Sequence, residues 1–423
     1  MIDVTWKKIR YKQNLDQMEA LLNMKQTQKI LSWRPRGFFQ WMLTILAVIA
    51  LPITVMTSYY IINPINVNHI MSIFAWIALM DPTILLIVTL IMIVLLVLAF
   101  WRKALIAQTI LIPVSILLIF WNIQPTISMW SMAKSEGVSL SLSSHFSIKK
   151  DVLSKPIQDV VYGKTSDGVE LMLDVWPAKG ESEDVLKPVI VKVHGGAWVE
   201  GSKSDAPTWN QWFNELGYTV FDVEYRMPPQ SSWKDEVGDV KSAIGWVVTN
   251  ADTYKIDPKR INIMGFSAGG NLAMLAAYSM GNAQLPPSTN VPNVSIKSVI
   301  NLYGPADMTT FYKSTPSPDY VQNAMKKYIG GSPAQFPERY KTLSPINYIQ
   351  ESTPPTITFL GTSDRFVPEE QAKNLDKMLA VNGVSHELYL LPGADHGFDA
   401  RPGNLGTQFA REKIKAFLQK YNK

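Results

Sequence analysis

The stretch "INIMGFSAGGNLAMLAA", residues 261–277, places one serine between glycines, directly after a short β-branched run and directly before an alanine-rich run. β-Branched residues favour a strand and alanine favours a helix, so the serine is predicted to lie at a strand-to-helix turn. Gly265-Phe266-Ser267-Ala268-Gly269 matches Gly-x-Ser-x-Gly, in which small neighbours permit a sharp turn that exposes the serine hydroxyl. Ordinary turns also contain small residues, so Ser267 is a candidate nucleophile only if the chain supplies a base, an acid and an oxyanion site.

The C-terminal part of the chain alternates predicted strands and helices. An Asp-Gly turn makes residues 161–178 a hairpin. This alternation predicts an α/β fold with a mostly parallel sheet and helices on both faces, whose ligand site lies beyond the carboxyl ends of the strands. The further strands are expected at 187–198, 218–226, 260–266, 296–304, 356–362 and 386–393, and the helices at 206–216, 235–254, 268–280, 369–382 and 405–421.

His396 is the candidate base, because it lies in the loop "LPGADHGF" directly after the last predicted strand. From there it can point back over the sheet edge toward Ser267. His386 begins that same strand and therefore lies at the opposite end of a parallel sheet, so we interpret it as a surface or strand-entry histidine.

Asp364 is the candidate acid that orients the base. It follows the predicted strand that ends near Gly361, on the same side of the sheet as Ser267. A carboxylate in this role fixes the histidine tautomer and stabilises the imidazolium. Asp395 and Asp399 flank His396 in sequence, but such neighbours reach the ring Nδ1 atom with difficulty, so both are interpreted as solvated or structural.

The segment "HGGAW", residues 194–198, follows the strand "VIVKV" and is the candidate oxyanion site. Glycine there lets backbone N–H groups approach a substrate closely. The expected donors are the N–H groups of Gly196 and Ala197, with Gly195 adjoining, and of Ala268 after the nucleophile. His194 is interpreted as a structural residue that braces this loop.

Residues from about 160 to 418 resemble the esterase and lipase α/β-hydrolases, namely the hormone-sensitive-lipase-like branch and the bacterial feruloyl-esterase-like proteins. The resemblance implies an α/β-hydrolase fold, a carboxylic ester hydrolase that acts through a Ser–His–Asp triad and an acyl-enzyme, and no cofactor. The chain order Ser267, Asp364, His396 is also that of this family. The sequence departs from many lipase relatives at Ala197, where they have a third glycine. The motifs that carry the resemblance are "HGGAW", "DVEYR", "DVKSAIGWV", "GFSAGGNLA", "NLYGPAD", "GTSDRFVP" and "GADHGF".

The composition separates the N-terminal third from the rest of the chain. Residues 1–123 carry ten Lys and Arg against four Asp and Glu, whereas residues 124–423 carry thirty against thirty-one. The basic character is therefore confined to the N-terminal third, which favours a membrane partner over nucleic acid. The chain has no cysteine, and its five histidines are dispersed, so no metal site is predicted.

Three membrane spans are predicted, at about 38–62, 83–101 and 104–123, because each run is long and apolar enough to cross a bilayer. The eleven residues 70–80 are too short to cross, and we interpret them as an interfacial or re-entrant helix. Residues 11–31 are predicted to form an amphipathic helix on the cytoplasmic side. The predicted domains are a basic segment at 1–37, a transmembrane region at 38–123, a linker or cap segment at 124–155 and an α/β-hydrolase domain at 156–423.

The basic residues predict the orientation. Residues 1–37 carry eight Lys and Arg against three acids, which places the N-terminus in the cytoplasm, and Arg102-Lys103 then form an inner turn. With three spans, the hydrolase domain lies outside the cell at a multi-pass cell membrane. A fourth crossing at 70–80 would invert this conclusion.

The expected substrate is a small-molecule, glycan or lipid ester, and the sequence leaves the oligomeric state open. Three alternatives remain: a prolyl-oligopeptidase-like peptidase, a membrane acyltransferase, and a non-catalytic binding protein of the same fold. Residues 305–350 are too long for a plain connector and are expected to form a cap over the pocket. Trp198, Trp209 and Trp212 are expected either to join this cap or to pack in the core.

Overall fold

The computed structural model describes residues 15–26, 33–65, 70–147, 154–179 and 185–422. They form two compact units. The first runs up to Ser58 and includes Leu85–Asn122, and the second comprises Tyr59–Ile84 and the chain from Ile123 onward. The second unit is therefore larger than the predicted hydrolase domain at 156–423, because it also contains the short apolar segment between the first two long helices.

An eight-stranded sheet forms the centre of the second unit, with strand order β1-β2-β4-β3-β5-β6-β7-β8. The pairs β1–β2 and β2–β4 are antiparallel, and all the other neighbouring pairs are parallel. The predicted mostly parallel sheet is thus confirmed. The strands are β1 (Ile157–Lys164), β2 (Glu170–Trp176), β3 (Lys187–Val193), β4 (Thr219–Val223), β5 (Ile256–Phe266), β6 (Ser298–Leu302), β7 (Thr356–Gly361) and β8 (His386–Leu391).

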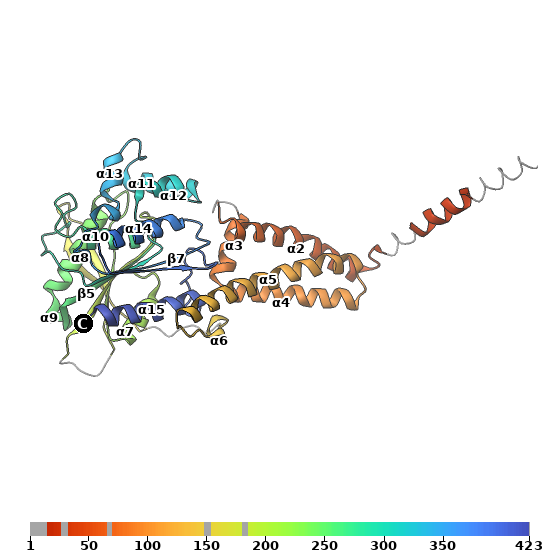
Figure 1. The fold of residues 1–423 in the computed structure, drawn as a ribbon, viewed down its shortest axis with the longest axis horizontal. Helices are drawn as coiled ribbons and strands as arrows, with labels where there is room; N and C mark the ends of the chain where they lie inside the picture. Colours follow the sequence, from red (N-terminus) through yellow and green to blue (C-terminus); the bar gives the residue numbers. More distant parts are fainter. Residues whose placement is uncertain (1–14, 27–32, 66–69, 148–153, 180–184, 423) are drawn as a thin grey trace, which may run out of the picture. The chain divides into compact units, whose positions relative to one another are not determined.

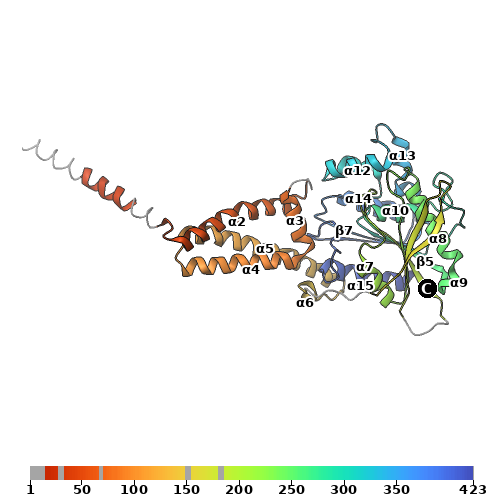
Figure 2. The same ribbon diagram turned by 180° about the vertical axis from the view of Figure 1, so that it is seen from behind.

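Helices cover both faces of the sheet. Helices α8 (Asp235–Thr249), α10 (Ala268–Tyr278) and α14 (Glu369–Val381) lie over one face, and α7 (Pro207–Glu215) and α15 (Leu405–Tyr421) lie over the other, as both views show (Figures 1 and 2). Every residue of β4, β6 and β7 is buried. These strands are mostly apolar because neither face meets water, although β4 includes the buried Asp222 and β6 the buried Asn301.

The segment between β6 and β7 folds as short helices: α11 (Met308–Ser314), α12 (Pro318–Ile329), α13 (Pro337–Thr342) and the 3₁₀ turn η1 (Pro345–Tyr348). Asp307 caps α11 by accepting hydrogen bonds from the backbone N–H groups of Thr309 and Thr310. This is the segment that the sequence predicts as a cap.

Within the described ranges, three helices are long and apolar enough to cross a membrane by length and composition: α2 (Phe38–Ile62), α4 (Pro82–Trp101) and α5 (Leu105–Ser135). In the first unit their contacts centre on small side chains, which let helix backbones approach closely. The buried residues of this cluster are Leu43, Ala47, Ala99, Ala104, Ala107 and Leu111.

The structure differs from the prediction at the end of the third apolar helix. Helix α5 continues to Ser135 instead of ending near residue 123, so the predicted linker at 124–155 begins as a helix. Met129 and Ala133, on this extension, are buried in the hydrophobic core of the sheet-containing unit. The short helix α6 (Leu142–His145) follows. Residues 148–153 of the predicted linker lie outside the described residues.

Two shorter predicted helices lie before the sheet. Residues 15–26 are helical, whereas 11–14 and 27–31 of the predicted amphipathic helix lie outside the described residues. Residues 70–80, predicted as a short interfacial or re-entrant helix, form α3 (Ile70–Met80). Helix α3 belongs to the same compact unit as the sheet.

Candidate active site

Ser267 lies at the sharp turn between β5 and α10, as the sequence predicts. Its backbone has φ +52° and ψ −120°, a conformation that residues other than glycine rarely adopt. A Cβ atom at Gly265 would come 2.1 Å from the Gly269 carbonyl oxygen, and a Cβ atom at Gly269 would come 2.2 Å from that of His194. Only glycine fits at either position, which explains the spacing of the motif physically.

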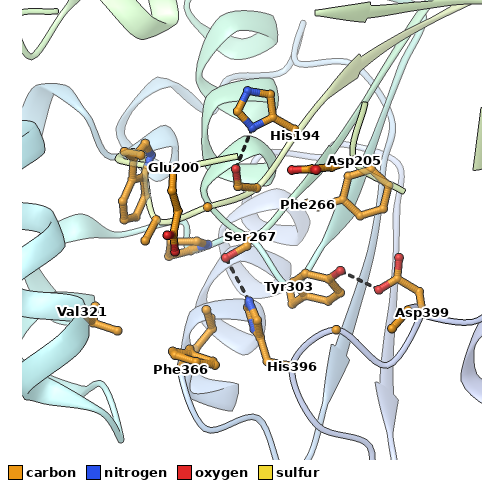
Figure 3. A pocket seen from close by; sticks show the side chains of 18 of the residues that line it. His194, Glu200, Asp205, Phe266, Ser267, Tyr303, Val321, Phe366, His396 and Asp399 are labelled. Carbon is orange, nitrogen blue, oxygen red and sulfur yellow. Dashed lines mark hydrogen bonds between the residues drawn. The ribbon is translucent and has the colours of Figure 1, made fainter. Parts of the chain in front are cut away.

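The structure brings Ser267, His396 and Asp364 together. The Nε2 atom of His396 lies 2.9 Å from the Ser267 Oγ atom, and the two side chains point toward each other (Figure 3). The Nδ1 atom of His396 lies 2.8 Å from an Asp364 carboxylate oxygen. The three side chains therefore form a continuous hydrogen-bonded chain, although they come from positions 267, 364 and 396.

Asp364 is held rigidly in the loop after β7. Its other carboxylate oxygen accepts hydrogen bonds from the backbone N–H groups of Phe366 and Val367, each 2.8 Å long. The Asp364 side chain is only 1% exposed. The carboxylate thus has a fixed direction toward His396 and little contact with water.

Asp395 and Asp399 face other partners. Asp395 accepts hydrogen bonds from the Arg365 guanidinium, and burial raises the pKa of Asp395 to about 6. Asp399 accepts hydrogen bonds from the Tyr303 hydroxyl and from the Trp209 indole, and burial raises its pKa above the usual range. Asp395 therefore pairs with Arg365, and Asp399 with Tyr303 and Trp209, whereas Asp364 pairs with the His396 imidazole.

His386 occupies the remote position that the sequence predicts. It is the first residue of β8 and pairs with Thr356, the first residue of β7. Its Nε2 atom lies 3.3 Å from a carboxylate oxygen of Asp376. A second His–Asp pair therefore exists at the opposite end of the sheet from Ser267.

The loop from His194 to Trp198 lies beside Ser267. Gly195, Gly196 and Ala197 line the same cavity as Ser267, and a Cβ atom at Gly195 would lie 3.4 Å from that of Ser267. Gly196 has φ +110° and Ala197 has φ +50°. Ala268 is buried at the first position of α10, next to Ser267.

His194 braces this loop from behind. Its Nδ1 atom lies 2.7 Å from the Gly195 carbonyl oxygen, and its ring stacks on Tyr225 at a centroid distance of 4.2 Å. Burial lowers the pKa of His194 to about 4. The ring is therefore neutral at pH 7, and Nδ1 donates the hydrogen bond to the carbonyl oxygen.

A cavity of about 410 Å³ opens onto Ser267 and His396. Val321 of the predicted cap lines it (Figure 3). Phe311 and Tyr320 of the cap and Trp198 also line it. Trp209 packs in the core with no exposed surface, and Trp212 is half-buried against that core.

Trp76 and Met80 of α3 also line this cavity, and sequence reasoning missed both residues. They lie more than 180 positions before Ser267, in a segment whose apolar composition indicates only a membrane-associated helix. No motif in that segment marks it as part of a site.

The comparisons with known proteins match part of this chain to esterases. A family profile described as BD-FAE matches residues 173–379. The chain is 30% identical over 264 residues to esterase LipQ of Mycobacterium tuberculosis, covering 62% of this chain and 61% of the relative. The sheet-containing unit has the fold of the α/β-hydrolase esterases. The chain is also 30% identical over 249 residues to the isoprenylcysteine alpha-carbonyl methylesterase ICME of Arabidopsis thaliana, covering 56% of each chain.

Solved structures of esterases resemble 62% to 65% of this chain. A truncated carbohydrate esterase from gut microbiota has a TM-score of 0.55 and 26% identity, covering 65% of this chain and 99% of its own. The propionate-bound esterase 2 of Thermogutta terrifontis has a TM-score of 0.53 and 27% identity, covering 62% and 94%. The chain spans about three fifths of the length of the mycobacterial esterases LipQ and LipC, two of the curated relatives that it matches.

Proposed function

We propose that this protein is a membrane-anchored serine esterase that hydrolyses carboxylic esters with Ser267 as nucleophile, His396 as base and Asp364 as orienting acid. The observation that carries the proposal is the hydrogen-bonded chain from Asp364 through His396 to Ser267 at the edge of a ligand-sized cavity. The esterase names of the relatives support the same reaction.

The reaction proceeds by acyl transfer to water. His396 Nε2 takes the Ser267 proton as the hydroxyl oxygen attacks the ester carbonyl, and the resulting imidazolium protonates the departing alcohol. A water molecule then attacks the acyl-enzyme, and His396 again removes and returns the proton. Asp364 keeps Nδ1 protonated, so that Nε2 is the atom that accepts the proton.

The oxyanion of the tetrahedral intermediate is assigned to the backbone N–H groups of Gly196, Ala197 and Ala268, with Gly195 beside them. The support is the position of these residues around Ser267 and the positive φ angles that turn the loop. Losing one donor of this kind raises the reaction barrier by about 3 kcal/mol.

The anchor is assigned to α2, α4 and α5. With the basic N-terminal segment in the cytoplasm, three crossings place the hydrolase unit outside the cell membrane. The apolar lengths of the three helices and the basic residues Arg102 and Lys103 between α4 and α5 support this orientation.

The test is an esterase assay of the full chain in detergent with p-nitrophenyl acetate. We expect hydrolysis by the wild type and a loss of about 10⁴-fold in kcat for Asp364→Asn, because asparagine at this position favours the wrong histidine tautomer. Asp376→Asn is the matched control, since the Asp376 carboxylate pairs with His386 at the opposite end of the sheet. This variant should retain wild-type activity. A wild type inert toward esters, or an Asp364→Asn variant within tenfold of it, contradicts the proposal.

A further inference from the structure

Helix α3 is fixed to the two loops that carry Asp364 and His396. The fully buried Arg365 guanidinium donates hydrogen bonds to the Ser72 carbonyl oxygen at 2.5 Å and to the Ser72 hydroxyl at 2.9 Å, while it also pairs with Asp395. Asn404 donates a hydrogen bond of 2.7 Å to the Met80 carbonyl oxygen. A buried guanidinium that loses its acceptors is costly, so these contacts hold α3 firmly in place.

The inner face of α3 forms part of the cavity wall beside the candidate base. The Trp76 indole N–H donates a hydrogen bond of 2.8 Å to the backbone carbonyl oxygen of His396. The Trp76 ring meets Phe366 edge-on at a centroid distance of 5.5 Å, and Phe366 in turn lies 4.9 Å from the imidazole. Met80, one turn further along, also lines the cavity.

The outer face of α3 exposes four large apolar side chains at helical spacing. Their exposed fractions range from 36% to 58%, and α3 contains no charged residue. Positions i, i+3, i+4 and i+7 lie on one face of a helix. A continuous apolar face of this kind marks contact with a partner or a membrane. The four residues, called the outer face below, are Ile70, Ile73, Phe74 and Ile77.

The position of α3 in the chain favours a lipid bilayer as the occupant of the outer face. Met80 is two residues before Pro82, the first residue of α4, and α4 is one of the three helices that could span a membrane. Two residues extend at most about 7 Å. If α4 crosses a bilayer from Pro82, the C-terminal end of α3 therefore lies within about 7 Å of the bilayer surface. An uncharged helix with an exposed apolar face is suited to lie along that surface.

We infer that α3 lies in the bilayer surface through its outer face and forms, with Trp76 and Met80, a wall of the ester-binding cavity, so that the substrates are amphiphilic esters taken from the membrane. This inference rests on the proposed esterase function. The apolar part of the ester lies in the bilayer before binding and in the cavity beside α3 after binding.

The first experiment compares two esters on the full chain in phosphatidylcholine–phosphatidylglycerol vesicles: dissolved p-nitrophenyl acetate and vesicle-borne 4-methylumbelliferyl oleate. The double variant Phe74→Ser/Ile77→Ser should keep its kcat/KM for the acetate within twofold and lose about tenfold in rate on the oleate. Val381→Ser, which removes an apolar side chain of α14 that is 72% exposed, should change neither rate. An unchanged oleate-to-acetate ratio in the double variant overturns the inference, whereas a wild type inert on the acetate refutes the esterase function instead.

The second experiment needs no activity and uses the absence of cysteine from the chain. Phe74→Cys and Val381→Cys are each labelled with a nitrobenzoxadiazole fluorophore in the full chain, in vesicles that contain lipid with a nitroxide near the headgroup. Quenching at position 74 without quenching at position 381 is the expected result. Equal quenching at the two positions, or no quenching at position 74, overturns the inference even if the serine variants fold poorly.

Discussion

Replacing Ser267 by alanine is expected to lower kcat for p-nitrophenyl acetate by about 10⁶-fold, because the variant has no oxygen to attack the ester carbonyl. The variant should fold as the wild type does. The Ser267 backbone N–H donates to the Leu302 carbonyl oxygen at 2.9 Å, and this bond does not involve the side chain. Alanine at φ +52° is no more strained than serine, since both carry a Cβ atom.

The control for Ser267→Ala is its thermal unfolding curve in the same detergent, which should coincide with that of the wild type. The activity that remains should resemble the weak acceleration that the oxyanion site alone provides. Hydrolysis by Ser267→Ala within a hundredfold of the wild type, with folding unchanged, would show that another group performs the attack.

Replacing His396 by asparagine is expected to lower kcat by a similar factor of about 10⁶, because the serine proton then has no acceptor. The chain offers a matched control in His386, which also contacts an aspartate but lies at the opposite end of the sheet. His386→Asn should hydrolyse p-nitrophenyl acetate within twofold of the wild type.

Comparing the two histidine variants separates loss of the catalytic base from loss of activity through destabilised structure. Both substitutions remove an imidazole from β8 or the loop after it, and both leave a side chain of similar polarity. Equal losses in the two variants would mean that the losses reflect structure, and an active His396→Asn variant would exclude His396 as the base.

The sheet and the three convergent side chains could be predicted because local signals determine them. The buried strands are short, mostly apolar runs, and parallel strands bring all their carboxyl ends to one edge. Ser267, Asp364 and His396 each follow the carboxyl end of a parallel strand. They lie close together because the strand order places these ends near one another. The distinction between His396 and His386 followed from the same rule, because they lie at opposite ends of β8.

The contribution of α3 could not be predicted, because no local signal encodes it. Trp76 contacts His396 across 320 positions of sequence, and Ser72 contacts Arg365 across 293. An apolar composition suits lipid and protein equally well, so the sequence of α3 does not distinguish its two faces. The extension of α5 was missed for the same reason: Met129 and Ala133 reveal their role only when the core that buries them is known.

The cap was predicted in part. Length alone marked residues 305–350 as more than a connector, and Phe311, Tyr320 and Val321 line the cavity. The three tryptophans could not be assigned from the sequence, since an aromatic ring suits a core and a pocket equally. In the structure, Trp198 lines the cavity, whereas Trp209 is buried and donates to Asp399.

The most direct test of the account is covalent capture of the nucleophile with a fluorophosphonate probe, followed by peptide mass spectrometry. The account predicts that the full chain gains one phosphonyl group on Ser267, and that labelling is lost in Ser267→Ala and strongly slowed in His396→Asn. Labelling of a different residue, or labelling of Ser267 at the same rate when His396 is replaced, would contradict it.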